Sequence, residues 1–420
     1  PPPPFSTQTT AYAISLGLVG SEMCIRDSTK SLENAIAKTV SRLEGGNSIL
    51  VISTLEKGRI IAARKGNSGS IAIGTGNNEM FVASDLPAIV PHTKTVQHLD
   101  AEEMAIISPE KVLYRDLTGK QLEKPYTEIP STLQSPSKGN FEHFMLKEIY
   151  EQPHAIQSSL SGRINFHSQV VDFEELTEGT INIKNFNRIV LTGMGTSLNA
   201  AIYGAQIFEK ILGVQSSAEN SSELRYRDPV FDEKTLLIAI TQSGETADTL
   251  SAIGHFKKKS CSVISVIETS GTQASRISDC TISIRAGKEV GVAATKTLTS
   301  TMSTLFQLAL YFASTGNKSS SEFLHNAFND ISLLPSAISK ILDYEGHIKR
   351  LAENISHSSN LLYLGRGINV ATALEGALKM KEIAYIHAEG YAAGEMKHGV
   401  NALLGPVSYT HLTLPTNREV

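Results

Sequence analysis

Residues 188–286 decide the fold, because four apolar, β-branched runs alternate there with segments of helical character. The runs are RIVLTG (188–193), TLLIAIT (235–241), SVISVI (262–267) and CTISIRA (280–286). Continuous apolar runs of this length are typical of strands that are buried on both faces, and their alternation with helices predicts a parallel sheet. We therefore predict an α/β fold in which helices cover both faces of a parallel sheet.

Polar motifs follow two of these strands, where sheets of this kind bind their ligands. GMGTSLNA (193–200) is not a dinucleotide fingerprint, because Leu198 stands where the last glycine is needed. Hydroxyl groups in the first turn of a helix favour an anion, although Ser and Thr also serve simply as helix caps. Two such turns on one sheet predict a pocket for a phosphate monoester. Its candidate residues are Gly195, Thr196, Ser197, Thr241, Gln242, Ser243 and Thr246.

A third loop, GKEVGVAATKT (287–297), follows the last of the four runs. Glu289 and Val292 are candidates to line the same pocket, together with Thr295 and Lys296. An equally good interpretation is that this glycine-containing loop only opens the long apolar helix expected at 298–315.

A second candidate site lies in LLYLGRGINVATALEGALKMKEIAYIHAEGYAAGEMKHG (361–399), which predicts a strand, a glycine turn and a helix. Glu375, Lys379 and Glu382 fall at i, i+4 and i+7, so they share one face of an otherwise apolar helix. The stripe is either a row of solvated ion pairs or one wall of a cleft, and the spacing alone leaves both open. Moving a proton between adjacent carbons of a sugar phosphate needs a base, a polarising donor and a phosphate anchor.

The remaining chain divides into segments of different composition. Residues 30–116 predict one helix followed by short antiparallel strands, and 117–140 have the Pro, Ser and Gly content of a linker. Residues 141–163 predict a helix interrupted at Pro153. Residues 1–29 open on a proline run and lack the features of a signal peptide, and 407–420 show neither helical nor strand periodicity. We expect a non-native or disordered leader and a non-native tail, and the alternative is a pair of native irregular ends.

Composition excludes several classes of protein. The 420 residues are 41% hydrophobic and 19% charged with a formal net charge of −4, which gives no support for a nucleic-acid or membrane partner. Cys24, Cys261 and Cys280 show no metal-ligand spacing, and so few cysteines fit a reducing compartment. We expect no metal, no cofactor and a cytoplasmic location.

Several motifs together resemble the glutamine-fructose-6-phosphate aminotransferase (isomerising) family. They are HFMLKEIYEQP (143–153), SELRYRD (222–228), TQSGETADT (241–249), GVAATKT (291–297), LGRG (364–367) and ALEGALKMKEIAYIHAEGYAAGEMKHG (373–399). The resemblance covers about 30–406. It implies the later part of an α+β, Ntn-type glutaminase domain at 30–116, a complete sugar isomerase (SIS) domain at 141–344 and the start of a second at 345–406.

The resemblance also implies roles for individual residues. Residues matching Thr196, Ser197, Gln242, Ser243 and Thr246 hold the phosphate of fructose 6-phosphate. The residue matching Glu382 moves the proton between C1 and C2, Lys379 assists at the C2 carbonyl, and Glu375 is a neighbour that tunes it. The residue matching His398 promotes ring opening from the adjacent subunit, which implies a homodimer.

Some positions depart from the family pattern. Met194 replaces a usual Cys, Thr241 replaces a usual Ser and keeps its hydroxyl, and Ala294 loses a hydroxyl that the family places in the pocket. The family's glutaminase uses an N-terminal cysteine, whereas residue 1 here is Pro and Cys24 lies in the expected leader. We therefore do not expect this chain to hydrolyse glutamine, which is a substrate only of the intact family enzyme.

The resemblance implies conversion of fructose 6-phosphate to glucosamine 6-phosphate with ammonia derived from glutamine. This chain is expected to retain mainly the part that binds and isomerises the sugar phosphate. Two alternatives stay open: a non-catalytic SIS module that binds sugar phosphates, and an inactive structural fragment.

Overall fold

The computed structural model describes residues 31–404 except 55, 67, 85, 130–136, 177–180, 228, 270 and 317–320. The expected leader (1–29) and tail (407–420) lie outside the described residues. The chain divides into two units, of which the first comprises Pro1–Ser137 and Glu245–Ser251 and the second Lys138–Gly244 and Ala252–Val420. Within the described ranges, no helix combines the length and the apolar character that crossing a membrane requires.

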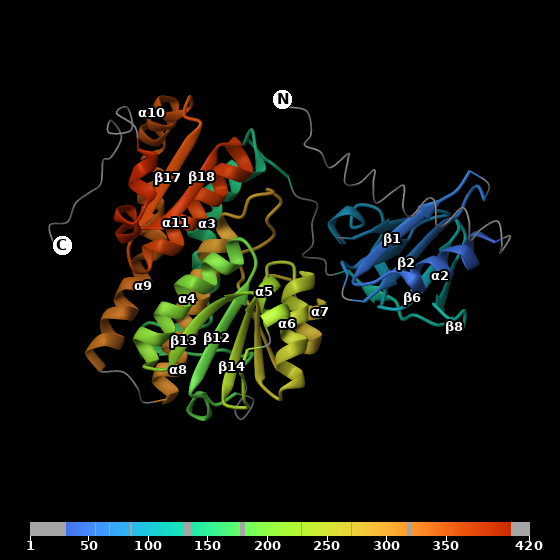
Figure 1. Ribbon diagram of the computed structural model, residues 1–420, viewed down its shortest axis with the longest axis horizontal. Helices are drawn as coiled ribbons and strands as arrows, with labels where there is room; N and C mark the ends of the chain where they lie inside the picture. Colours follow the sequence, from blue (N-terminus) through green and yellow to red (C-terminus); the bar gives the residue numbers. More distant parts are fainter. Residues whose placement is uncertain are drawn as a thin grey trace. The chain divides into compact units, whose positions relative to one another are not determined.

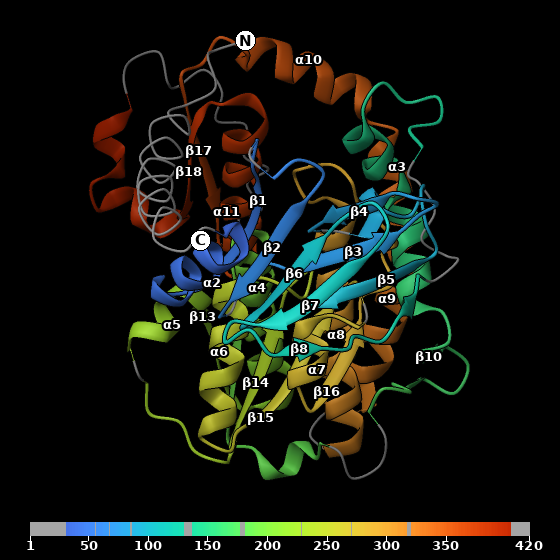
Figure 2. The ribbon, with the colours of Figure 1, turned by 90° about the vertical axis from the view of Figure 1, so that its right-hand side faces the viewer.

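From residue 31 to 129, the first unit consists of helix α2, a short 3-10 turn and two antiparallel sheets (Figure 2). Helix α2 (Leu32–Arg42) begins at Ser31, whose side chain accepts a hydrogen bond from the backbone of Asn34. Successive residues of a strand point to opposite faces of its sheet, and both faces of the first sheet are apolar. Ala62 and Ala105 face Ile71 and Ile73 of the other sheet, and the alternate residues of the same strands, such as Ile61, pack under α2.

The strands of the first sheet lie in the order β1 (Asn47–Ile52), β2 (Ile60–Lys65), β6 (Glu103–Ile107), β7 (Val112–Asp116) and β8 (Gln121–Leu122). The second sheet has the order β4 (Met80–Ala83), β3 (Ile71–Thr75), β5 (Thr95–Leu99) and β9 (Thr127–Glu128), and η1 is Leu86–Ala88. Strands β8 and β9 lie in the segment that the composition suggested as a linker.

The second unit is built on a five-stranded parallel sheet, which confirms the predicted α/β fold. Its order is β13 (Gln215–Asn220), β12 (Arg188–Gly193), β14 (Thr235–Ile240), β15 (Ser262–Ile267) and β16 (Cys280–Ser283). Figure 1 shows α4 (Thr196–Leu212) and α8 (Lys296–Gly316) on one face, and α6 (Ala247–Lys258) and α7 (Gln273–Ile277) on the other. The main core lies between the sheet and the α4–α8 layer.

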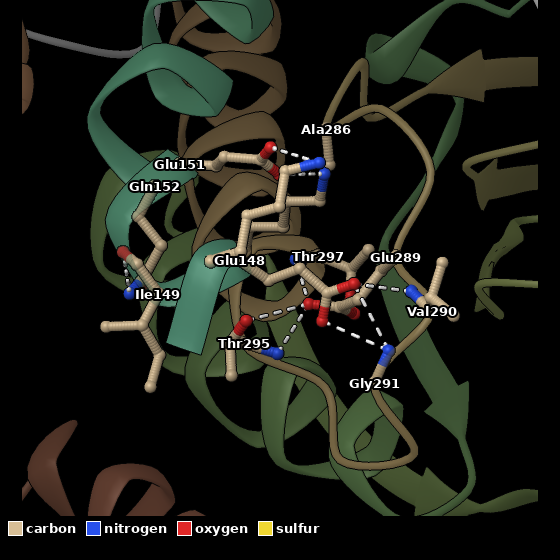
Figure 3. Close-up of polar contacts among 12 residues, drawn as sticks. Glu148, Ile149, Glu151, Gln152, Ala286, Glu289, Val290, Gly291, Thr295 and Thr297 are labelled. Atoms are coloured by element: carbon tan, nitrogen blue, oxygen red, sulfur yellow. Dashed lines mark hydrogen bonds and ion pairs between the residues drawn. The ribbon is translucent and has the colours of Figure 1, made fainter. Parts of the chain in front are cut away.

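Helix α3 (Phe144–Leu160) runs without a break through Pro153, so the interruption expected at this residue is wrong. Proline has no N–H to donate to the carbonyl of Ile149. The side-chain amide of Gln152 donates to this carbonyl instead, at 3.1 Å (Figure 3). A side chain thus replaces the missing backbone hydrogen bond.

Six further elements precede residue 356 in the described part of the second unit, and one of them, α9, adds Ala327 and Phe328 to the main core. They are β10 (Ile164–Asn165), β11 (Val170–Val171), η2 (Ile183–Asn185), α5 (Ser221–Arg227), α9 (Ser321–Leu342) and α10 (Glu345–Ile355).

A second, two-stranded parallel sheet follows α10. It pairs β17 (Asn360–Gly365) with β18 (His387–Ala392), and α11 (Asn369–Lys379) connects them and also contacts α4. A Cβ at Gly390 would lie 2.7 Å from the Cα of Leu374, so glycine permits the close approach of α11 to β18. A π-helical turn, η3 (Met380–Ala384), extends α11, and η4 (Ala393–Lys397) and η5 (Val400–Leu403) complete the described chain.

Candidate functional site

A cavity of about 30 Å³ lies at the carboxyl ends of β12 and β14, beside the start of α8. Hydroxyl and amide groups supply its polar surface, and among the described residues no charged side chain lines it. By this measure the cavity holds about two water molecules. A sugar phosphate is larger, so its entry requires the surrounding loops to move apart. The lining residues are Thr196, Ser197, Ala200, Thr241, Gln242, Val266, Ile284, Ala294, Thr297, Leu298 and Thr301.

The turn between β12 and α4 brings the first residues of α4, Thr196 and Ser197, to this cavity. Gly195 caps α4 with φ 54° and ψ −125°, a conformation that side chains with a Cβ rarely adopt. A Cβ at Gly193 would lie 2.7 Å from the carbonyl carbon of Ser197, so the strand also needs glycine at its end. Thr196 and Ser197 therefore lie at the positive end of the α4 dipole, where an anion is stabilised.

The predicted stripe on α11 is assembled as one ion-pair chain. Lys379 Nζ lies 3.2 Å from Glu375 Oε1 and 2.6 Å from Glu382 Oε2. The side chain of Glu375 is 8% exposed and that of Glu382 is 33% exposed. The row of ion pairs therefore runs from the interior toward solvent. A partly buried ammonium between two carboxylates is unlike the fully solvated row that the spacing had left open.

Thr196 connects the stripe to the cavity. Its Oγ1 donates to Glu375 Oε1 at 2.9 Å and accepts from Lys379 Nζ at 3.2 Å. Asn199, one turn further along α4, donates from Nδ2 to Glu375 Oε2 at 2.7 Å. Both oxygens of the buried Glu375 carboxylate therefore accept hydrogen bonds from α4. These bonds hold the charged residues of α11 next to the turn that begins α4, which is a candidate to bind phosphate.

The loop after β14 contributes unequally. Thr241 is buried and lines the cavity, as does Gln242, whereas the side chain of Ser243 is exposed. Thr246 directly precedes α6 and is not among the lining residues. A Cβ at Gly244, where φ is 68°, would collide with the Thr272 hydroxyl, so glycine is required for this turn.

The loop before α8 differs from the expectation. Val292 is fully exposed, and neither Val292 nor Thr295 is among the residues that line the cavity. The Glu289 carboxylate accepts from Thr295 N at 2.7 Å and from the hydroxyl groups of Thr295 and Thr297 (Figure 3). It also accepts from Gln242 Nε2 at 3.3 Å. Glu289 thus caps the start of α8, and it connects to the cavity through two lining residues, Gln242 and Thr297.

His398 lies apart from the stripe. It follows η4, is exposed, and its backbone N–H donates to the carbonyl of Glu395 at 2.9 Å. Across the described part of the chain, no group of three His, Cys, Asp or Glu side chains is arranged to hold a metal ion.

Sequence reasoning missed three polar residues of the site. Thr297 and Thr301 lie one turn apart at the start of α8 and line the cavity, while their hydroxyls donate to Glu289 and to the Thr297 carbonyl. Their i, i+4 spacing at the opening of a helix was the available signal. Asn199 was inside the quoted 193–200 motif, but its role depends on α11, which is 176 residues away.

The comparisons with known proteins agree with this architecture. The family model for the SIS domain matches residues 182–311 and 354–408. The isomerising glutamine–fructose-6-phosphate aminotransferase of Thermococcus kodakarensis is 39% identical over 400 residues, covering 95% of this chain and 63% of the relative. That of Methanosarcina mazei is 38% identical over 401 residues, covering 95% and 64%. The chain therefore spans less than two thirds of the length of either relative.

A solved structure extends the comparison to three dimensions. The C-terminal domain of glucosamine-fructose-6-phosphate aminotransferase from Francisella tularensis superposes with a TM-score of 0.62 at 33% identity. The match covers 64% of this chain and 75% of that domain. Sequence and fold agree, and the chain belongs to the glutamine–fructose-6-phosphate aminotransferase (isomerising) family.

Proposed function

We propose that this chain binds fructose 6-phosphate at the cavity and moves a proton between its C1 and C2, as part of an enzyme that forms glucosamine 6-phosphate. One observation carries the proposal: Thr196 lines the cavity and is hydrogen-bonded to both Glu375 and Lys379. A phosphate anchor and a chain of titratable groups therefore meet at one residue, as a 1,2-proton transfer on a sugar phosphate requires.

The phosphate is assigned to the hydroxyls around the α4 N-terminus. Ser197 supplies an uncharged donor, and the helix dipole favours the dianion. The Thr297 and Thr301 hydroxyls donate to Glu289 and to the Thr297 carbonyl, so they must rotate before they can donate to the phosphate. Ser243 and Thr246, on the loop after β14, join them when the loops rearrange around the ligand. This arrangement leaves the sugar carbons free to extend toward α11.

Glu382 is assigned as the base, because it is the more exposed carboxylate of the stripe. Its carboxylate takes the proton from C1, the electron pair moves into the C2 carbonyl, and the Lys379 ammonium stabilises the oxygen that becomes negative. A proton then passes from the C1 hydroxyl to the C2 oxygen, and return of the abstracted proton at C2, with formation of the C1 carbonyl, gives the aldose. When ammonia first condenses at C2 with loss of water, the same transfer gives the 2-amino sugar.

Further elements of the proposal come from the family. Ammonia derives from glutamine in the intact enzyme, His398 opens the sugar ring of the adjacent subunit in a homodimer, and the location is cytoplasmic. The exposed position of His398 supports a role outside its own site.

The proposal is tested by the interconversion of fructose 6-phosphate and glucose 6-phosphate, with binding measured in parallel by calorimetry. We expect Glu382→Gln to lower kcat by roughly 100-fold or more with an unchanged Kd, since a positioned base contributes about 10²–10⁴. Ser197→Ala should raise Kd instead. Binding without turnover in the wild-type chain would favour a non-catalytic sugar-phosphate module, and an absence of binding would refute the proposal.

A further inference from the structure

Ala294, which lines the cavity beside Thr297 of α8, belongs to a loop without regular structure. This α8 loop, Gly287–Thr295, connects β16 to α8. Since no strand pairing fixes its backbone, its position depends on side chains from other elements. Those contacts come mainly from α3, a helix that contributes nothing to the cavity lining.

Glu148 of α3 holds the middle of the α8 loop. It is 2% exposed, and its carboxylate accepts from Val290 N at 2.5 Å and from Gly291 N at 3.1 Å (Figure 3). A Cβ at Gly291 would lie 2.5 Å from Glu148 Oε2, so glycine allows this close approach. Hydrogen bonds from N–H groups to a buried carboxylate are among the stronger ones in proteins.

Glu151, one turn along α3, holds the end of the same loop. Its Oε2 lies 2.8 Å from Nζ of Lys296, the first residue of α8, which is 5% exposed. Burial alone would raise the pKa of the Glu151 carboxyl, but the hydrogen bonds and charges of Lys296 and, to a smaller extent, Lys147 together hold the pKa below its usual value. Both α3 carboxylates are therefore used by the segment that forms the cavity wall.

Glu289 closes the α8 loop on itself. Its carboxylate accepts from the backbone and side chain of Thr295 and from Thr297, while Gln242 connects it to the loop after β14. Because Glu148 fixes Val290 and Gly291, it also fixes the neighbouring Glu289. The hydrogen bonds of Glu289 in turn set the positions of Thr295 and Thr297. A displacement at Gly291 is therefore transmitted to the hydroxyl of Thr297 at the cavity.

We propose that Glu148 is a positioning residue for the phosphate pocket, which it shapes by binding the backbone N–H groups of Val290 and Gly291. The inference rests on the proposed function, because the pocket is taken to hold the phosphate of fructose 6-phosphate. Glu148 does not touch the ligand. It acts through the α8 loop and sets the affinity of the pocket.

Glu148→Gln is the direct test, because glutamine has the same shape as glutamate but carries an –NH₂ group in place of one oxygen. This group cannot accept the hydrogen bonds that the backbone N–H groups donate. For the full chain we expect Kd for fructose 6-phosphate to rise about tenfold or more, and KM for isomerisation to rise similarly with kcat within about twofold. Glu148→Asp, which keeps the charge, should recover part of the affinity. Glu142→Gln is the matched control: its carboxylate is exposed just before α3, and we expect no change.

Amide hydrogen exchange separates this inference from the proposed function, because it needs no ligand. In Glu148→Gln the amides of Val290 and Gly291 should exchange faster, whereas those of the β12 strand should be unchanged. Absence of fructose 6-phosphate binding in the wild type would refute the function, yet the exchange result would still decide whether Glu148 holds the loop. The inference would be overturned if a folded Glu148→Gln variant exchanged both amides at the wild-type rate. It would also be overturned if this variant bound fructose 6-phosphate with the wild-type Kd.

Gly291→Ala provides a second route if Glu148→Gln does not fold. It leaves α3 unchanged and places a methyl group against Glu148 Oε2, so the loop must shift. The same rise in Kd is expected, and an unchanged Kd would overturn the inference.

Discussion

Asn199 Nδ2 lies 2.7 Å from Glu375 Oε2, so α4 of the five-stranded sheet and α11 of the two-stranded sheet share a buried hydrogen bond. Asn199→Ala removes the Nδ2 donor and leaves Glu375 Oε2 without this hydrogen bond. We expect the free energy of unfolding to fall by about 1–3 kcal/mol, measured by urea unfolding. Glu209→Ala, on an exposed position of α4, is the control and should change it by less than about 0.5 kcal/mol. Equal effects of the two substitutions would show that the hydrogen bond does not stabilise the structure.

Thr196 offers a test of how the stripe is oriented. Thr196→Val keeps the shape but removes the hydroxyl that accepts from Lys379 and donates to Glu375. We expect kcat for isomerisation to fall roughly 10- to 100-fold, because small misplacements of catalytic groups have effects of this size. Thr196→Ser keeps the hydroxyl and should stay within a few fold of the wild type. If both variants behaved alike, the hydroxyl would have no orienting role.

Gly244 tests the turn after β14. Gly244→Ala forces a Cβ onto the Thr272 hydroxyl at a residue whose φ is 68°, and should lower the free energy of unfolding by about 1–3 kcal/mol. Gly254→Ala is the matched control, because Gly254 lies inside α6 with open space around its Cα. There alanine should stabilise by about 0.5–1 kcal/mol. Thermal unfolding compares the two, and a loss at Gly254 as large as that at Gly244 would contradict the steric account.

Ala294 tests whether the cavity lacks a donor. Ala294→Ser places a hydroxyl in the lining, where a hydrogen bond to a charged phosphate is worth about 1.5 kcal/mol, or roughly tenfold in Kd. Val292→Thr adds a hydroxyl to the same loop at a fully exposed position and should leave Kd unchanged. Calorimetry with fructose 6-phosphate measures both. A weaker or unchanged affinity in Ala294→Ser would place the phosphate elsewhere.

The buried thiols predict how stability depends on alkaline pH. Burial raises the pKa of Cys261 to about 11 and that of Cys280 to about 12, from a usual value of 9.0. The unfolded chain therefore releases these protons first, and the stability they contribute is complete below pH 9 and is lost as pH rises toward the folded pKa values.

We expect each thiol to add a slope of about −1.4 kcal/mol per pH unit to the free energy of unfolding between pH 9 and 11. Cys261→Ala and Cys280→Ala should each flatten the urea-derived curve in this range relative to the wild type. Parallel curves for wild type and variants would show that the thiols ionise equally in both states.

The parallel sheet could be predicted from the sequence because its signal is local. Each of the four apolar runs became a strand, and the strand ends carry the polar turns. The α11 stripe was also predictable from helical spacing, although the chain changes to a π-helical turn at Met380, which ideal α-helical geometry does not anticipate. Glu382 nevertheless reaches Lys379 at 2.6 Å.

The parts that could not be predicted depend on contacts between distant residues. Helix α3 continues through Pro153 because the neighbouring Gln152 happens to satisfy the Ile149 carbonyl. Val292 is exposed in a loop whose position depends on the hydrogen bond from Gly291 to Glu148, which is 143 residues away. Neither propensity nor spacing contains this information.

The most direct test of the central claim is thermal unfolding of the full chain with and without fructose 6-phosphate. A ligand that binds only the native state stabilises it by about 2.7 kcal/mol at a hundredfold excess over Kd. We predict a rise in Tm with fructose 6-phosphate but not with fructose, and its loss in Ser197→Ala. An unchanged Tm in a wild-type chain that unfolds cooperatively, or an equal rise in Ser197→Ala, would contradict the assignment of the cavity as the phosphate site.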